Sequence, residues 1–243
     1  MSSFKERIRK LSSEKSPLIL ANDYENPKNL ELKTINNIKS LAKYLCAIKF
    51  NFHLLLPLGE KQISKINKIA HKHGLQTIAD IKLNDIGNTN LITAKRLWSS
   101  GFDAVIVNPM MGPRGLGNLI NYAHKNKKGV ISLCHMSSPE AKVTYELKLA
   151  TKKNLYQLFL EWALKMRADG IIVGATFPQM IQYCEQQSKG KLDIYSPGIG
   201  TQGGDLQKTL LAGSDFLIVG RSILNSKDPL QAAKMLYDLA SKN

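Results

Sequence analysis

The sequence predicts a single (β/α)8 TIM barrel preceded by a short N-terminal helix. Eight short apolar segments alternate with helix-like segments along the 243 residues. The apolar segments carry almost no charge until their last positions, as expected of parallel strands that are buried on both faces. The polar residues gather at the C-terminal ends of these segments, where barrels of this class place their sites.

The elements are expected in the following order. Residues 1–16 form a leading helix, because Ser3 and Glu6 have capping-box spacing and Pro17 ends the segment. The strands are expected at 18–21, 46–50, from Thr77 through Lys82, and at 104–107, 130–134, 171–174, 193–195 and 216–219. Prolines or caps begin three of the later helices, at Asn26-Pro27, Pro178 and Asp228-Pro229. Glycines are expected to stop six of the helices, at Gly74, Gly101, Gly129, Gly170, Gly190 and Gly213.

One alternative fold remains at this point, a doubly wound open sheet, because the strand–helix rhythm alone does not show closure. Eight βα units in 243 residues fit one barrel, so residues 1–243 are expected to form one domain. The chain contains no linker, low-complexity tract or second domain pattern.

The amino-acid composition limits the classes of protein to which the chain can belong. Hydrophobic residues make up 43% and charged residues 22%, which is ordinary for a globular protein. No apolar run is long enough to span a bilayer, and the charged N-terminus lacks the apolar core of a signal peptide. We therefore expect a cytoplasmic protein with no membrane partner. Cys46, Cys134 and Cys184 have no metal-like spacing and are expected to be reduced thiols.

The formal net charge of +15 raises the hypothesis of a nucleic-acid-binding barrel. The basic residues are spread over nearly every predicted helix, with few aromatic residues among them. A lysine-rich solvated surface is the preferred interpretation, so no nucleic-acid partner is expected. The positive field would still help to capture an anionic substrate.

The third strand ends in the charged run Asp80, Lys82 and Asp85. Residues two apart on a strand point the same way, so Asp80 and Lys82 are expected to share the barrel interior. Buried ion pairs contribute little to stability, which makes this run a candidate for chemistry. A structural ion pair at the barrel mouth is the alternative.

Other polar residues follow the remaining strands. Asp23 follows the first strand, Lys49 lies late in the second, and Ser137 follows the fifth. The glycine-rich loop from Ser196 to Asp205 follows the seventh strand, and Gly220-Arg221 ends the eighth. Backbone amides of such a loop suit a phosphate, and Arg221 would add a charge-assisted contact.

Two other interpretations are weaker. Gly198, Gly200 and Gly203 spell a dinucleotide fingerprint, but the next strand ends in Gly220-Arg221 and not in the acid that the fingerprint requires. The histidines have no metal-ligand spacing, and Lys82 would compete with a metal held between Asp80 and Asp85. No metal is expected.

The segment Asp80-Ile-Lys82-Leu-Asn-Asp85-Ile86-Gly-Asn-Thr89 closely resembles the DxKxxDIxNT signature of orotidine 5′-phosphate decarboxylase. Four further motifs resemble that family: Leu-Ile-Leu-Ala-Asn-Asp23, Ala-Ile-Lys49, His-Met-Ser137 and Ile-Val-Gly220-Arg221. The loop Ser-Pro197-Gly-Ile-Gly-Thr-Gln202-Gly-Gly-Asp resembles its phosphate loop. The length resembles the compact, archaeal-type branch, whereas the loop at residues 108–112 departs from the usual pattern.

The resemblance implies decarboxylation of orotidine 5′-phosphate to uridine 5′-phosphate and carbon dioxide, the last step of de novo UMP biosynthesis, without a metal or organic cofactor. It implies a charged array with Lys82 as the proton donor, flanked by Lys49, Asp80 and Asp85. It also implies a homodimer in which Asp85, Ile86 and Thr89 enter the partner's site. The substrate-binding residues implied are Asp23, Lys49, Ile86, Thr89, Ser137, Pro197, Gln202, Gly220 and Arg221.

A related barrel enzyme acting on a sugar phosphate is the rival interpretation. Metal-assisted 3-keto-gulonate-phosphate decarboxylases and hexulose-phosphate synthases also carry a D-x-K-x-x-D run. The continuation from Ile86 to Thr89 and the presence of Gln202 favour the pyrimidine enzyme.

Overall fold

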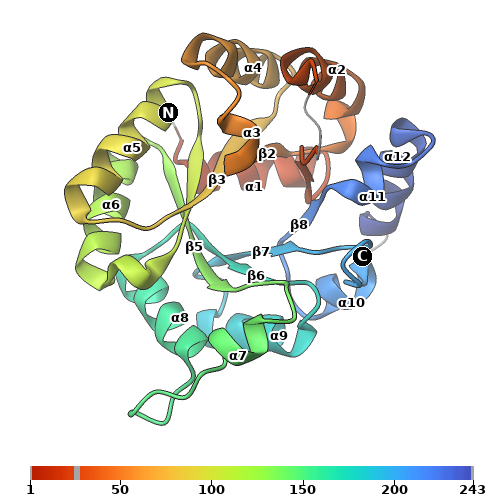
Figure 1. Ribbon diagram of the computed structural model, residues 1–243. Coiled ribbons are helices and arrows are strands. Elements are labelled where there is room, and N and C mark those ends of the chain that lie inside the picture. Colours follow the sequence, from red (N-terminus) through yellow and green to blue (C-terminus); the bar gives the residue numbers. More distant parts are fainter. Residues whose placement is uncertain (1, 25–27, 242–243) are drawn as a thin grey trace.

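The computed structural model describes residues 2–24 and 28–241, and its strands form a closed barrel. Eight parallel strands follow one another around the barrel in chain order, and β1 (Leu18–Ala21) pairs with both β2 (Ala47–Asn51) and β8 (Phe216–Val219). This closure confirms the (β/α)8 barrel and excludes the open sheet. Figure 1 looks along the barrel, with the strands at the centre of a ring of helices.

The remaining strands are β3 (Gln76–Leu83), β4 (Ala104–Val107), β5 (Gly129–His135), β6 (Gly170–Val173) and β7 (Asp193–Pro197). The longer helices are α1 (Phe4–Glu14), α2 (Leu30–Leu41), α4 (Glu60–Lys72), α5 (Gly87–Ser99), α6 (Pro113–Lys125), α8 (Leu155–Met166), α9 (Pro178–Ser188), α10 (Leu206–Leu211) and α12 (Pro229–Ala240). Short helices that the sequence analysis missed follow four strands: α3 (Phe52–Leu55), η2 (Pro109–Met111), α7 (Ala141–Thr144) and α11 (Arg221–Leu224). A further short helix, η1 (Ala42–Tyr44), directly follows α2.

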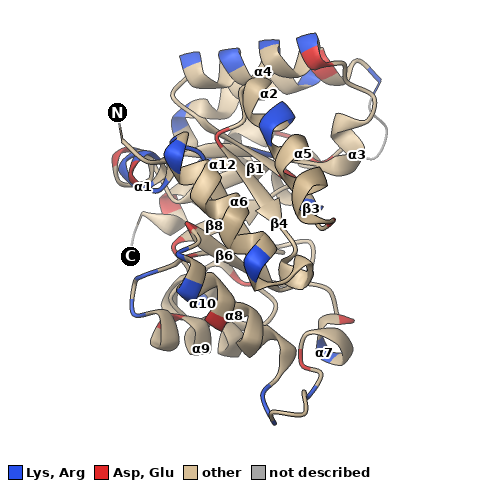
Figure 2. Ribbon diagram, turned by 90° about the vertical axis from the view of Figure 1, so that its left-hand side faces the viewer, with Lys and Arg blue, Asp and Glu red and all other residues tan. Residues whose placement is uncertain are grey.

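The leading helix begins as predicted, with both hydrogen bonds of the Ser3–Glu6 capping box present. It lies at the end of the barrel opposite α3 and α7, as the side view in Figure 2 shows. Its Phe4 ring packs so closely on the start of β5 that a Cβ at Gly129 would lie 2.2 Å from the ring. This contact explains why glycine occupies that position.

Two predicted helix stops are wrong, because Gly129 and Gly170 begin strands. The preceding helices α6 and α8 end earlier, at Lys125 and Met166. A Cβ at Gly170 would lie 2.4 Å from the Asp193 carbonyl oxygen and 2.5 Å from the Tyr195 ring. Glycine is therefore required at this strand start by close packing, and not by a helix terminus.

The interior of the barrel is filled in layers, because side chains two apart along each strand point the same way. The ring of Tyr195 stacks on that of Phe216, with centroids 4.6 Å apart, in the space that Gly170 leaves open. Both rings are buried. Two residues further along the strands lie Ile172 and Ile218, which line the floor of a pocket at the C-terminal ends of the strands. The fold thus has a packed lower half and an open upper end.

The second helix differs from its predicted start. Asn26-Pro27 lies outside the described residues, while Lys28 and Asn29 form a turn and α2 begins at Leu30. The remaining predicted helix starts are confirmed: Pro178 opens α9, and Asp228 caps α12 by accepting a hydrogen bond from the Gln231 amide.

The distribution of basic residues over the helices agrees with the sequence analysis. Figure 2 shows lysine and arginine spread over several outer helices of the face in view. Within the described ranges, no helix is long and apolar enough to cross a membrane.

Candidate active site

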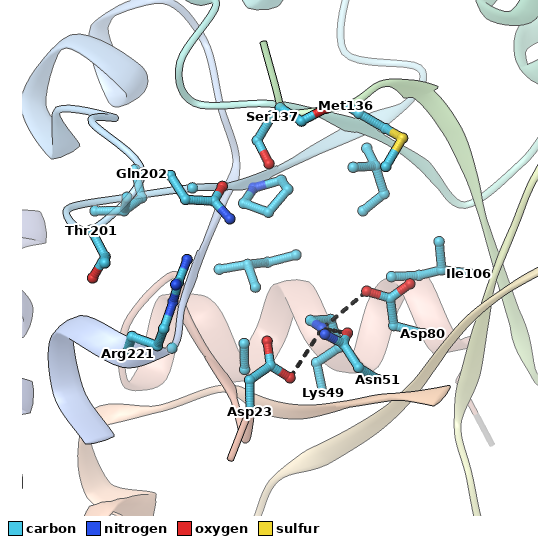
Figure 3. A pocket seen from close by; sticks show the side chains of 18 of the residues that line it. Asp23, Lys49, Asn51, Asp80, Ile106, Met136, Ser137, Thr201, Gln202 and Arg221 are labelled. Atoms are coloured by element: carbon cyan, nitrogen blue, oxygen red, sulfur yellow. Dashed lines mark hydrogen bonds and ion pairs between the residues drawn. The ribbon is translucent and has the colours of Figure 1, made fainter. Parts of the chain in front are cut away.

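One pocket of about 270 Å³ lies at the C-terminal ends of the strands, and it brings together most of the predicted site residues (Figure 3). Its floor is apolar, with side chains from β1, β4, β5, β6 and β8. Nine predicted residues line it: Asp23, Lys49, Asp80, Lys82, Ser137, Pro197, Gln202, Gly220 and Arg221. They are far apart in sequence, and the parallel strands bring them to one rim.

The predicted charged array is centred on Asp80. Its Oδ2 lies 2.9 Å from Lys49 Nζ and its Oδ1 lies 2.8 Å from Lys82 Nζ, so one carboxylate joins two ammonium groups. Lys49 Nζ is also 4.0 Å from Asp23 Oδ1. The side chains of Lys49 and Asp80 are only 4% and 9% exposed, whereas that of Lys82 is 39% exposed and opens toward solvent.

Burial and the neighbouring charges shift the pKa of Asp80 in opposite directions. Burial opposes ionisation, but the ammonium groups of Lys49 and Lys82 outweigh it and hold the pKa of Asp80 below its usual range. The carboxylate is therefore ionised at neutral pH despite its burial. It pairs with both lysines and holds them in place.

Lys82 occupies an unusual backbone position. The pairing of β3 with β4 passes from Asp80↔Ile106 to Leu83↔Val107, so Ile81 and Lys82 form a bulge. Lys82 has φ of 45°, a left-handed conformation that costs a non-glycine residue about 1–2 kcal/mol. The regular alternation assumed in the sequence analysis therefore fails here, although Lys82 and Asp80 do meet. Strain of this kind is concentrated at functional sites.

The opposite wall of the pocket carries Gln202 and Arg221, whose side chains Figure 3 shows facing the cavity from the loop after β7 and from the end of β8. Lys49, Lys82 and Arg221 provide three cations against the two carboxylates of Asp23 and Asp80. The charged lining thus favours an anionic ligand.

The glycine loop differs in detail from the expected phosphate cradle. The amides of Gly200, Gly203 and Gly204 donate to carbonyl oxygens inside the loop. The amide of Thr201 donates to the Ser222 hydroxyl at 3.2 Å. These four amides therefore stabilise the loop itself.

Close packing of glycines places Ser137 beside Gln202. A Cβ at Gly198 would lie 2.8 Å from Gln202 Oε1 and 3.0 Å from Ser137 Cβ. A Cβ at Gly174 would lie 2.5 Å from Ser137 Cα. Only glycines at these two positions let the segment after β5 approach the loop after β7.

Three predicted residues do not line this pocket. Asp85, Ile86 and Thr89 are exposed around the start of α5, and Ile86 is 73% exposed. The Asp85 carboxylate accepts a hydrogen bond from the Ile86 amide at 2.6 Å. The charged array within the chain therefore consists of Lys49, Asp80 and Lys82.

Asn51 and Thr201 are polar pocket residues that the sequence analysis missed. Asn51 could have been found, because it lies two positions after Lys49 on the same strand and so shares its direction. Thr201 carries no comparable signal, since the direction of a loop side chain does not follow a period. Among the described residues, no three His, Cys, Asp or Glu side chains are grouped to hold a metal ion.

A closed barrel with this charged pocket at its strand ends defines a (β/α)8-barrel enzyme. Residues 16–236 match the model of the orotidine 5′-phosphate decarboxylase / HUMPS family. The chain belongs to this family.

Its relatives include the archaeal orotidine 5′-phosphate decarboxylase of Pyrococcus horikoshii, which is 34% identical over 222 residues, covering 91% of this chain and 97% of that protein. The enzyme of Thermococcus kodakarensis is 34% identical over 226 residues, with coverages of 93% and 97%. The structure of orotidine 5′-monophosphate decarboxylase from Methanocaldococcus jannaschii, complexed with the inhibitor BMP, superposes with a TM-score of 0.79 at 28% identity and covers 92% of this chain and 97% of that one.

Proposed function

We propose that this protein decarboxylates orotidine 5′-phosphate to uridine 5′-phosphate and carbon dioxide, the last step of de novo UMP biosynthesis. The observation that carries the proposal is the Lys82 ammonium, held 2.8 Å from Asp80 in a pocket whose opposite wall presents Arg221. Family membership and the named relatives support the same reaction.

Lys82 is the proposed proton donor. Loss of carbon dioxide leaves the electron pair of the broken bond on C6 of the pyrimidine, where delocalisation is poor. An ammonium aimed at that carbon stabilises the developing negative charge and then transfers a proton to it. Each turnover thus consumes one proton, which Lys82 recovers from water.

Asp23 and Lys49 are proposed to hold the ribose. Asp23 Oδ1 is buried and accepts no hydrogen bond from the described residues, and the nearest ammonium, Lys49 Nζ, is 4.0 Å away. A sugar hydroxyl would satisfy this carboxylate oxygen and accept from Lys49 in turn. Asp80 would hold Lys82 in place through their ion pair and would lie close to the substrate carboxylate.

The opposite wall is proposed to bind the ends of the nucleotide. Ser137 would read the edge of the pyrimidine, and Gln202 and Arg221 would hold the phosphate beside Pro197 and Gly220. The charge of Arg221 is important here, because the phosphate is a dianion and a guanidinium can contact two of its oxygens. Binding energy from this remote group would help close the site.

Arg221→Ala should raise KM by about 10- to 100-fold with a smaller change in kcat, because hydrogen bonds to charged groups contribute about 1.5–3 kcal/mol. Steady-state kinetics with orotidine 5′-phosphate measure both constants. A loss confined to kcat would contradict the phosphate role. Arg114→Ala, on α6 and outside the pocket lining, is the matched control and should leave both constants unchanged.

We further propose a homodimer whose sites are shared. Among the described residues, Lys82 forms one ion pair, with Asp80, and its remaining surface is open. Asp85, Ile86 and Thr89 are exposed on the same rim of the molecule. In the proposed dimer, Asp85 of each protomer completes the array of the other, and Ile86 and Thr89 contact the other's substrate.

Mixing the inactive variants Lys82→Ala and Asp85→Ala should restore activity in mixed dimers. One site of a mixed dimer then carries both substitutions and the other carries neither, so up to about a quarter of all sites become wild type after random exchange. Activity is measured after subunit exchange has been verified with differently tagged chains. Absence of recovery would show that each site is built from one chain.

The proposed reaction requires no metal or organic cofactor. The direct test is the loss of ultraviolet absorbance of orotidine 5′-phosphate in metal-free buffer. Turnover that persists in EDTA supports the proposal, whereas activity on a sugar phosphate that EDTA abolishes would favour the rival barrel enzymes. RNA binding that is tight and salt-sensitive, without turnover, would favour a nucleic-acid-binding protein.

A single barrel domain in the cytoplasm is also proposed. Cys46, Cys134 and Cys184 are buried free thiols, as expected in a reducing compartment. Fractionation of source cells, with the protein detected by antibody, tests the location.

A further inference from the structure

Asn51 lies where β2 ends and α3 begins, and its side chain does not make the contact expected at a helix start. Asparagine is among the preferred residues at a helix N-cap because its oxygen accepts a backbone N–H. Asn51 occupies the N-cap of α3, yet its side chain makes no capping hydrogen bond. Its Oδ1 instead accepts a hydrogen bond from Lys49 Nζ. The side chain therefore contacts a charged residue of the pocket and does not cap the helix.

The sheet register places Asn51 within the charged array. In the pairing of β2 with β3, Asn51 lies directly beside Asp80. Figure 3 shows its side chain next to that of Lys49, between Asp23 and Asp80. An ammonium has three N–H donors and no acceptor, so the oxygen of Asn51 must face it. Asn51 and Asp80 are thus two acceptors that together fix the direction of the Lys49 ammonium.

We infer that Asn51 is a positioning residue for Lys49, an inference that rests on the proposed decarboxylase function. With one N–H on Asp80 Oδ2 at 2.9 Å and a second on Asn51, the third is left for the space beside Asp23, 4.0 Å away. That is the space proposed for a ribose hydroxyl. Asn51 thus fixes the direction in which the Lys49 ammonium faces the sugar. Asn51 itself need not contact the sugar.

The acceptor that Asn51 presents to Lys49 carries no charge. The pocket balances three cations against two carboxylates. A carboxylate at position 51 would be a third acid, directly beside Asp80, and the like charge would raise the pKa of one of the two groups. It would also repel an anionic substrate. Asparagine supplies the oxygen without that charge.

The test is a double-mutant cycle on kcat/KM with orotidine 5′-phosphate, at enzyme concentrations high enough to follow slow variants. Asn51→Ala should lower kcat/KM by about 10- to 100-fold in the wild-type background. It should have almost no further effect in a Lys49→Ala background, because the group that it positions is gone. Equal losses in both backgrounds would overturn the inference.

The pH dependence of kcat/KM in Asn51→Asp provides a second test. A purely structural role of Asn51 would leave this pH dependence unchanged. This substitution keeps the acceptor and adds a titrating charge, so kcat/KM should fall as pH rises through the pKa of the introduced carboxylate. Activity should recover at lower pH, where that group is neutral and Asp80, whose pKa is lowered, is still ionised. A pH profile shaped like that of the wild type would contradict a role beside Lys49.

Asn154→Ala is the matched control. Asn154 is also an asparagine N-cap whose side chain makes no capping hydrogen bond, and it lies outside the pocket lining. The variant should leave kcat/KM unchanged, because no pocket residue depends on the Asn154 side chain.

A second measurement separates this inference from the proposed function. If the wild type fails to decarboxylate orotidine 5′-phosphate, the proposed function is wrong, and Asn51 is then tested by NMR of the Lys49 ammonium protons. Their exchange with water should be at least about 5-fold faster in Asn51→Ala, since a hydrogen bond that protects them is lost. Unchanged exchange would overturn the positioning role whatever the substrate.

Discussion

Lys82→Ala is expected to lower kcat by at least about 10⁴-fold. The substitution removes the proposed proton donor, for which general acid catalysis contributes about 10²–10⁴-fold. It also removes the positive charge next to the developing carbanion, and electrostatic stabilisation of that kind contributes about 10²–10³-fold. The rate is measured by following orotidine 5′-phosphate at substrate saturation with micromolar enzyme.

The fold should survive this substitution. Alanine and lysine have a similar cost at the φ of 45° found at this position, so thermal melting should change little. Lys82→Gly removes that strain and should be equally inactive, which separates the chemistry from the backbone. Lys72→Ala, an exposed lysine in α4, should keep full activity. Substantial turnover by either Lys82 variant would rule out its role as the donor.

Asp80→Asn is expected to lower kcat/KM by about 10³-fold or more. The carboxylate oxygens lie 2.9 Å from Lys49 Nζ and 2.8 Å from Lys82 Nζ. An amide of the same shape has one acceptor, so its NH2 group would face one of the two ammonium groups. That lysine would be displaced, and misplacement of a reacting group by about 1 Å costs about 10²-fold, in addition to the lost electrostatic stabilisation.

Comparison with the same variant also predicts the direction in which folding stability changes with pH. The pKa of Asp80 is lower in the folded protein than its ordinary value of about 3.9, so the folded state gains stability from its ionisation above that value. This gain is lost as pH falls through the lowered pKa. The melting temperature of the wild type, relative to that of Asp80→Asn, should therefore decrease between about pH 6 and pH 3. A relative increase would contradict the lowered pKa.

Sequence periodicity was sufficient to predict the strands and helices, but not to explain all of the glycines. Apolar strands and helix caps predicted most elements to within a few residues, because burial on both faces leaves a clear local pattern. The sequence pattern predicts helix stops at Gly129 and Gly170, whereas these glycines are required by Phe4 and Tyr195, which pack against them from distant parts of the chain. A glycine needed for a turn and a glycine needed for close packing look the same in a sequence.

The meeting of Asp80 and Lys82 was predicted correctly from the sequence, but the strand geometry assumed for it was wrong. Alternation along a regular strand predicted that Asp80 and Lys82 would meet, and they do, but through a bulge with Lys82 in a left-handed conformation. The convergence of Asp23, Lys49, Ser137 and Arg221 on one pocket followed from their places at strand ends.

The sequence by itself determined the eight-unit rhythm, the family resemblance and the chemical types of the site residues, because these are properties of local pattern and composition. Only the tertiary structure decided that the sheet closes, that one carboxylate joins two ammonium groups, and that Asn51 turns from its helix toward Lys49. Closure and side-chain direction depend on contacts between residues far apart in the chain. No local period records such contacts.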